Sequence, residues 1–208
     1  MTCKPCVLLI HGLWMGPWAM SWLAHELRKA EFETEYLALR STGDTLDSHI
    51  DRLARAVSAI DAETIHLLGH SLGGVIILRY LKLNTDQRIG RALLLGAPAL
   101  GSQAAKQFDR QAWGSMLGAS REIWRSPFEA CVPDSAEVGA IAGDHAFGLG
   151  IFFASLNEPN DGAVTVAETQ VGGLRDHIVL PVSHSGMLLS GEVAKQSAVF
   201  FKTGSFER

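Results

Sequence analysis

Short apolar runs alternate with amphipathic segments along most of the chain. The apolar runs have strand length and fall at 7–10, 64–68, 92–95, 138–142 and 178–180, with a weaker one at 34–37. Between them, apolar residues recur every three or four positions, as on one face of a helix, at 17–30, 46–60, 72–83 and 192–201. Strands that are apolar on both faces are typical of a parallel sheet covered by helices on each side. The pattern therefore predicts an α/β fold, a doubly wound domain around a mostly parallel six-stranded sheet.

The alternation stops between Leu100 and Pro133. This segment has no strand pattern, but apolar residues recur in it at roughly helical spacing: Trp113, Met116, Leu117, Ile123, Trp124 and Phe128. A connection of this length in a compact domain usually serves a functional site. We interpret 101–133 as a helical cap inserted over one end of the sheet; helices simply fixed to the core are the alternative. No repeat or linker marks a second domain, so residues 1–208 are expected to form one domain.

The composition narrows the expected partners and location. The chain has 18 Lys and Arg against 22 Asp and Glu, a formal net charge of −4, whereas a nucleic-acid-binding face carries a basic excess. Nucleic acid is therefore not an expected partner. The apolar stretches are shorter than the ~20 residues that span a bilayer, and residues 1–10 lack the pattern of a secretory signal. We expect a cytoplasmic protein without stable membrane insertion, and this pattern does not indicate its oligomeric state.

The clearest chemical motif is Gly69-His70-Ser71-Leu72-Gly73, which lies directly between a predicted strand and a predicted helix. A serine on so sharp a turn needs small neighbours, which Gly69 and Gly73 provide, and its hydroxyl then projects above the edge of the sheet. The serine also lies at the N-terminus of a helix, whose dipole favours developing negative charge. The motif predicts that Ser71 is a catalytic nucleophile.

A second motif, His11-Gly12-Leu13, follows the first predicted strand. In the predicted sheet this strand and the strand before Ser71 end side by side, so the backbone N–H groups of Leu13 and Leu72 can point at the same oxygen. Two such donors would form an oxyanion hole for a tetrahedral intermediate. His11 itself is interpreted as a hydrogen-bonding residue that stabilises the turn.

The serine needs a base to accept its proton. His184 follows the last predicted strand, so its loop ends at the edge of the sheet where Ser71 projects. We therefore predict His184 as the base, with His145 and His177 as alternatives. The other histidines are expected elsewhere: His25 and His49 on helix surfaces, His66 beside the core, and His70 pointing away from the space of the nucleophile.

The base in turn needs a carboxylate, and two candidates follow the preceding strand. Asp161 lies in the turn Asn160-Asp161-Gly162, which can direct a carboxylate toward His184, and it is favoured. Asp144, directly after the strand, is the alternative. The predicted triad is Ser71, Asp161 and His184. Several unrelated folds carry such a triad, each with its own order along the chain, and the order here is the one expected for one of them.

Together these motifs resemble the α/β-hydrolase superfamily. The serine motif and the Asn-Asp-Gly turn are most similar to its bacterial lipase and inositol-deacylase-like lipase branches, and the match extends from the first strand to the last helix. The resemblance implies a minimal α/β-hydrolase fold and a serine hydrolase that acts on esters, with a mobile cap over the active site. Secreted lipases often place an acidic calcium ligand just after the histidine, but Ser185 and Gly186 follow here, so calcium is not expected.

The residues and the resemblance predict a carboxylic-ester hydrolase, an esterase or lipase, that acts through an acyl-enzyme intermediate. The alternatives are an acyltransferase or thioesterase with the same triad, and a non-catalytic binding protein of the same fold. The expected partner is a small-molecule ester with an apolar acyl group, for which Trp14, Trp113 and Trp124 are candidate contacts. No cofactor is expected; Cys3-x-x-Cys6 has no second pair at zinc-site spacing.

Overall fold

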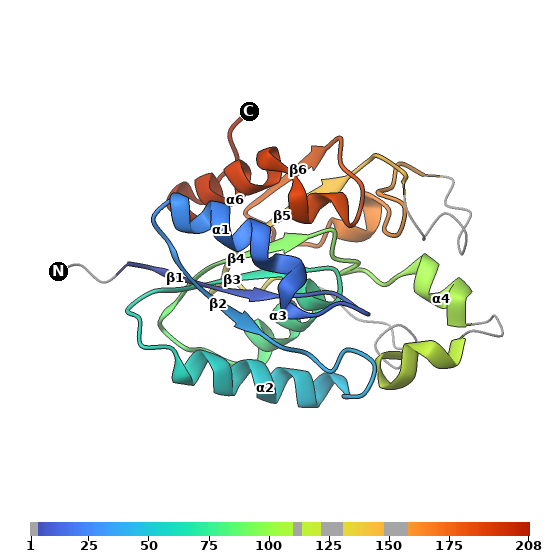
Figure 1. Cartoon of the computed structure of the whole chain (residues 1–208), viewed down its shortest axis with the longest axis horizontal. Helices are drawn as coiled ribbons and strands as arrows, with labels where there is room; N and C mark the ends of the chain where they lie inside the picture. The colour runs from blue at the N-terminus through green and yellow to red at the C-terminus, as the bar shows by residue number, and fades with distance from the viewer. Residues whose placement is uncertain (1–3, 110–113, 122–130, 148–157) are drawn as a thin grey trace.

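A computed structural model describes residues 4–109, 114–121, 131–147 and 158–208 of the chain (Figure 1). Its six strands form one sheet in the order β2-β1-β3-β4-β5-β6, and all neighbouring pairs are parallel. The strands are β1 (Cys6–Ile10), β2 (Glu33–Leu37), β3 (Ile65–His70), β4 (Ile89–Leu95), β5 (Glu137–Gly143) and β6 (Asp176–Leu180). The predicted six strands are confirmed, and the sheet is entirely rather than mostly parallel.

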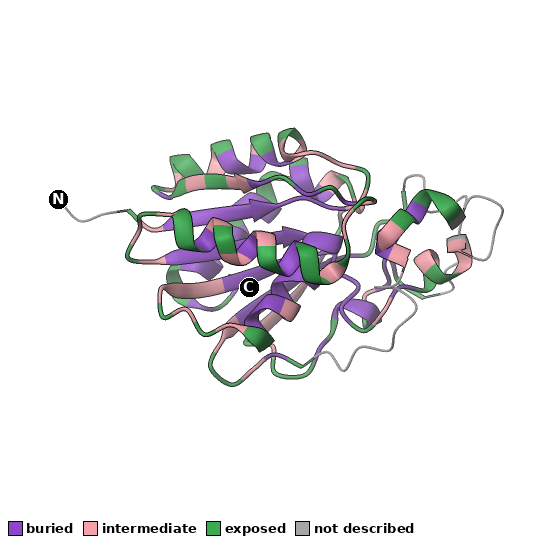
Figure 2. Ribbon diagram, turned by 90° about the horizontal axis from the view of Figure 1, so that it is seen from below, coloured by how far each residue is buried: buried purple, intermediate pink, exposed green. Residues whose placement is uncertain are grey.

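Helices cover both faces of the sheet (Figures 1 and 2). On one face lie α1 (Ser21–Lys29) and α6 (Gly191–Thr203); on the other lie α2 (Leu46–Ala59) and α3 (Leu72–Leu83). Successive residues of β1 point to opposite sides, so Leu8 packs with α2 and α3 while Leu9 packs with α1 and α6. This two-sided burial is the reason that the central strands are apolar at every position.

The shorter elements lie in the connections. They are the 3₁₀ helices η1 (Pro17–Met20), η2 (Gly114–Ser120), η4 (Ala167–Thr169) and η5 (Gly186–Leu189), and the helix α4 (Gln103–Asp109). α4 lies beyond the carboxyl ends of the strands, on the right of Figure 1. Within 101–133, the described stretches α4 and η2 are helical, whereas Cys131 pairs with Gly172 in an isolated β-bridge. Four of the residues that carry the helical spacing lie outside the described residues: Trp113, Ile123, Trp124 and Phe128.

One expectation about the helices is wrong. His49 was expected on the surface of its helix, but its side chain is fully buried. It lies three residues after Leu46 and four before Leu53, so it shares the stripe of α2 that faces the sheet. Helical position places a residue on a face regardless of its polarity, and here the face is buried.

The contact between α6 and the sheet gives a stability prediction. A Cβ at Gly139 of β5 would come within 2.6 Å of the Phe200 ring, so Gly139→Ala should lower the free energy of unfolding by ~1–3 kcal/mol through overpacking. Gly191→Ala, at the first turn of the same helix, meets nothing within 4 Å and should be neutral or slightly stabilising. Urea denaturation measures both, and equal stabilities of the two variants would contradict this packing.

Candidate active site

Ser71 occupies a sharp turn between β3 and α3. Its φ of 53° and ψ of −117° lie in a region that non-glycine residues rarely adopt and that costs energy to hold. The turn is closely packed, since a Cβ at Gly73 would collide with the Ile10 carbonyl and a Cβ at Gly69 with the backbone of the first turn of α3. Small residues are therefore required at both positions, as predicted.

His184 and Asp161 form a hydrogen-bonded pair at the same edge of the sheet. The His184 Nδ1–H donates to Asp161 Oδ2 at 2.8 Å, and the His184 backbone N–H donates to the Asp161 carbonyl, also at 2.8 Å. The second carboxylate oxygen, Oδ1, accepts from the N–H groups of Ala163 at 2.9 Å and Val164 at 2.7 Å. The Asn-Asp-Gly turn thus presents one oxygen to the imidazole and satisfies the other itself.

The pair is coupled electrostatically. The side chain of Asp161 is 1% exposed and that of His184 16%. Burial raises the pKa of Asp161, but the charge of His184 and the three hydrogen bonds to the carboxylate outweigh burial and lower the pKa below its usual value. Burial lowers the pKa of His184, but the charge of Asp161 and their hydrogen bond outweigh it and raise the pKa. Each of the two groups therefore stabilises the charged form of the other.

The other candidates for acid and base lie elsewhere. Asp144 and His145 are exposed after β5. His177 Nε2 is hydrogen-bonded to Thr169 Oγ1 at 2.9 Å. The geometry therefore brings Asp161, and not Asp144, to His184.

The turn of Ser71 and the His184–Asp161 pair both adjoin the carboxyl end of β4, where the Ser71 N–H donates to the Leu95 carbonyl at 2.9 Å. At Gly96, the residue after β4, a Cβ would lie 2.9 Å from Asp161 Oδ2 and 3.1 Å from His184 Nδ1. Gly96 has a φ of +52°, so a side chain there would be strained as well as obstructed. Within the described residues the Ser71 hydroxyl makes no hydrogen bond to His184; such contacts often tighten only when substrate binds.

The turn after β1 packs directly against Ser71. A Cβ at Gly12 would lie 3.2 Å from Ser71 Cβ. His11 holds this turn, because its Nδ1–H donates to the Gly12 carbonyl at 2.9 Å and its Nε2 accepts from the Leu39 N–H at 3.0 Å. His11 therefore stabilises the turn by hydrogen bonds, as predicted.

The backbone N–H groups of Leu13 and Leu72 remain available at this turn. In the described part of the chain, neither donates to another group. On the far side of Leu13, the Trp14 N–H donates to Ser41 Oγ at 3.1 Å, so the turn is anchored on both sides of the Leu13 amide.

Trp14 lies between the turn and the inserted segment. Its ring is half-exposed, and its Nε1–H donates to the Met116 carbonyl of η2 at 3.1 Å. The other two tryptophans predicted to contact substrate, Trp113 and Trp124, lie outside the described residues.

The expectation for His70 is wrong. Its ring does not point away from the site but lies against His184, with 4.6 Å between the ring centroids, and its Nε2–H donates to the His184 carbonyl at 2.9 Å. Complete burial, together with the charge of His184, lowers the pKa of His70 to about 3, so it is no candidate base. Motif spacing could not reveal this contact, because it depends on where the last loop returns.

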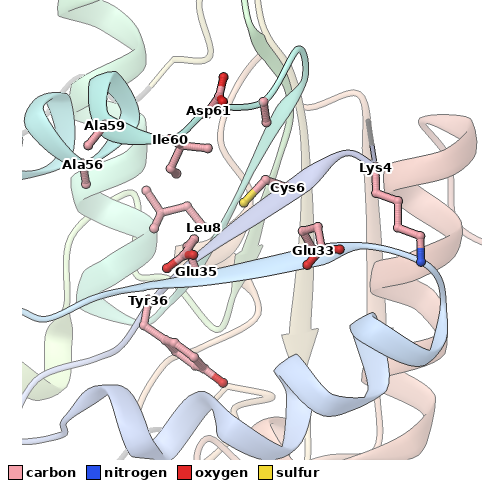
Figure 3. Close-up of a pocket in the computed structure, with 11 residues that line it drawn as sticks. Lys4, Cys6, Leu8, Glu33, Glu35, Tyr36, Ala56, Ala59, Ile60 and Asp61 are labelled. Atoms are coloured by element: carbon pink, nitrogen blue, oxygen red, sulfur yellow. The ribbon is translucent and has the colours of Figure 1, made fainter. Parts of the chain in front are cut away.

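The described part of the chain also contains a pocket of about 560 Å³, whose lining residues are drawn in Figure 3. It is lined by residues at the amino ends of β1 and β2 and at the end of α2, including Lys4, Cys6, Glu33 and Asp61. Ser71 lies at the carboxyl ends of the strands, so this pocket is not part of the candidate site. In the residues described, no cluster of three or more His, Cys, Asp or Glu side chains is placed to hold a metal ion. No described helix is both long and apolar enough to cross a membrane.

The sequence resembles a known family over most of its length. The sequence pattern of the alpha/beta hydrolase family matches residues 7–195. No curated protein matches the chain in sequence.

Similar folds occur in solved structures of lipases and esterases. The lipase BlEst2 of Bacillus licheniformis, in its mature form, aligns with a TM-score of 0.73 and 18% identity over 97% of this chain and 92% of its own. A lipase-esterase related protein from Clostridium acetobutylicum aligns with a TM-score of 0.62 and 16% identity, over 95% of this chain and 93% of its own. A metagenomic carboxyl esterase aligns with a TM-score of 0.66 and 15% identity, over 88% of this chain and 65% of its own. At these identities the likeness concerns the fold.

The coupling of His184 to Asp161 predicts how the histidine titrates. Because its pKa lies above the ordinary value of 6.5, the pair stabilises the fold fully below that pH, and the contribution is lost as the pH rises through the raised pKa. Burial lowers the pKa of His184, and the negative charge of Asp161 counteracts this effect. Asp161→Asn removes that charge, so the pKa of His184 should fall below 6.5. An NMR titration of the His184 ring measures both values. The same pKa in the variant and the wild type would contradict the coupling.

Proposed function

Because the chain belongs to the alpha/beta hydrolase family, we propose that it is a serine-dependent carboxylic-ester hydrolase with the triad Ser71, His184 and Asp161. The observation that carries the proposal is the buried hydrogen bond of 2.8 Å between His184 and Asp161, at the edge of the sheet where Ser71 sits in its strained turn. A hydroxyl, a base and a carboxylate that orients the base are the parts that acyl transfer to serine requires.

The proposed reaction follows from the tautomer that Asp161 holds. With its Nδ1–H bound to Asp161, His184 has Nε2 free to take the proton of the Ser71 hydroxyl as the oxygen attacks the ester carbonyl. The negative oxygen of the tetrahedral intermediate accepts hydrogen bonds from the N–H groups of Leu13 and Leu72, which have no other described acceptor. His184 then protonates the leaving alcohol, and the acyl group stays on Ser71.

Water completes the proposed cycle. His184 Nε2 accepts a proton from water as that water attacks the acyl-enzyme. The second tetrahedral intermediate then collapses to the carboxylic acid, and His184 returns the proton to the leaving Ser71 oxygen, which restores the hydroxyl. Throughout, the ionised Asp161 stabilises the imidazolium that forms at His184, in keeping with the raised pKa of this histidine.

The proposed substrate is a small-molecule ester with an apolar acyl group. Exposed apolar side chains follow several strands at this end of the sheet, namely Trp14, Leu100, Met116 and Phe147. The names of the structurally similar proteins, a lipase and a carboxyl esterase among them, agree with this class. Trp14 is the described side chain that we propose to contact the acyl group; Trp113 and Trp124 stay predictions.

The inserted segment is proposed to border the acyl site as part of the single domain 1–208. Its described part is attached to the loop after β2, because the Ala119 N–H donates to the Thr42 carbonyl at 2.8 Å. It is also attached to Trp14 through the Met116 carbonyl. Through these two hydrogen bonds η2 contacts the loop after β2 and Trp14, the residue after Leu13. The cytoplasmic location stays a prediction.

Replacing the nucleophile tests the proposal. Ser71→Ala should lower kcat for p-nitrophenyl esters by roughly 10⁶-fold, and His184→Ala by a comparable factor, because members of a triad act as a unit. The double variant should be no slower than either single one. Assays with a series of acyl lengths give these values, with melting temperature as the folding control. A Ser71→Ala protein that keeps a substantial part of the wild-type kcat would overturn the assignment.

Two matched carboxylates test the acid. Asp161→Asn should lower kcat by roughly 10⁴-fold, because an amide neither stabilises the imidazolium nor holds its tautomer. Asp144→Asn, the exposed control on the loop after β5, should leave kcat nearly unchanged. Steady-state kinetics on the two purified proteins decide between them. The reverse ranking would assign the acid to Asp144 and leave the Asn-Asp-Gly turn a structural role.

A further inference from the structure

The backbone of His184 is held at both of its polar groups. Its N–H donates to the Asp161 carbonyl at 2.8 Å, and its carbonyl accepts from His70 Nε2–H at 2.9 Å. The partner in the first bond is Asp161, the proposed acid. The partner in the second is His70, which immediately precedes Ser71, so this bond connects the turn of Ser71 to the loop of His184.

The His70 ring also touches the turn after β1. A Cβ at Gly12 would lie 2.9 Å from His70 Nδ1, and the ring itself is fully buried. With the ring of His184 on one side, at 4.6 Å between centroids, and Gly12 on another, His70 has little freedom to move. The His70 side chain therefore contacts both His184 and the turn after β1, and the residue itself directly precedes Ser71 in the chain.

The hydrogen bond shows which nitrogen of His70 carries a proton, and burial keeps the ring neutral. A carbonyl oxygen only accepts, so Nε2 carries the proton, and Nδ1 is buried without a hydrogen-bond partner in the described part of the chain. Burial, followed by the nearby charge of His184, lowers the pKa of His70 to about 3. His70 therefore stays neutral at the pH where His184 ionises, and it adds no second positive charge beside the imidazolium.

We propose that His70 is a positioning residue: its Nε2–H bond to the His184 carbonyl sets the distance and angle between the Ser71 hydroxyl and His184 Nε2. This inference rests on the proposed function, since it concerns the base of that reaction. Aligned reacting groups matter because a displacement of about 1 Å can cost on the order of 100-fold in rate. The donor, rather than the volume of the ring, is what the proposed role requires.

Three substitutions separate the donor from the ring. His70→Gln places an amide N–H near the position of Nε2, whereas His70→Asn places it near Nδ1, and His70→Phe keeps a ring of similar size without a donor. The matched control is His66→Phe. His66 is a buried histidine of the same strand, and its ring stacks on Phe201 at 4.8 Å near the other end of β3.

The measurements are kcat and KM for a p-nitrophenyl ester, expressed per folded molecule. His70→Phe and His70→Asn should lower kcat by about 10- to 100-fold with little change in KM, whereas His70→Gln should restore most of it. His66→Phe should lower the melting temperature and leave kcat per folded molecule unchanged. Equal kcat in His70→Phe and His66→Phe would overturn the proposal, as would a His70→Gln protein as slow as His70→Phe.

A second readout does not depend on turnover. The proton on His184 Nδ1, shared with Asp161, gives a downfield NMR signal that should move or broaden in His70→Phe and His70→Asn but not in His70→Gln or His66→Phe. An unchanged signal in all four variants would overturn the positioning role. If the wild type hydrolyses no ester, the proposed function fails, and the NMR signal still decides whether His70 positions His184.

Discussion

The buried hydrogen bond between His184 Nδ1 and Asp161 Oδ2 is the interaction on which the rest of the site depends. A carboxylate that is 1% exposed is costly to ionise. Here the cost is offset by the two N–H groups that bind Oδ1 and by the charge that His184 can carry. If the Asp161 turn and the His184 loop moved apart, each side chain would lose the partner that offsets the cost of burying its charge.

The sheet imposes the geometry of this pair. All strands are parallel, so the loops after β1, β3, β4, β5 and β6 leave from the same edge and meet there. Their closeness leaves no space for side chains at several positions. At Gly96 a Cβ would meet both members of the pair, at Gly73 it would collide with the end of β1, and at Gly12 it would approach Ser71. The hydrogen bond from His70 Nε2–H to the His184 carbonyl joins the turn after β3 to the loop after β6.

Periodicity and motif context were enough to predict the six strands, the four main helices, the family and the pairing of His184 with Asp161. Local patterns govern these features. The orientation of His70 depends on a contact between segments distant in sequence, which no local pattern contains. The burial of His49 does follow from its helical spacing to Leu46 and Leu53, but the polarity of the residue points to the opposite face. The strands also extend beyond their apolar runs, as β4 does from Ile89, because backbone pairing continues past the buried part of a strand.

The most direct test of the account is a crystal structure of the protein after reaction with a p-nitrophenyl alkylphosphonate, which mimics the tetrahedral intermediate. Phosphorus should be bonded to the Ser71 Oγ atom, with the phosphoryl oxygen about 3 Å from the N–H groups of Leu13 and Leu72. His184 Nε2 should lie on the side of the leaving group, with its Nδ1–H still bound to Asp161. A phosphonate on any other residue, or an unmodified Ser71, would contradict it.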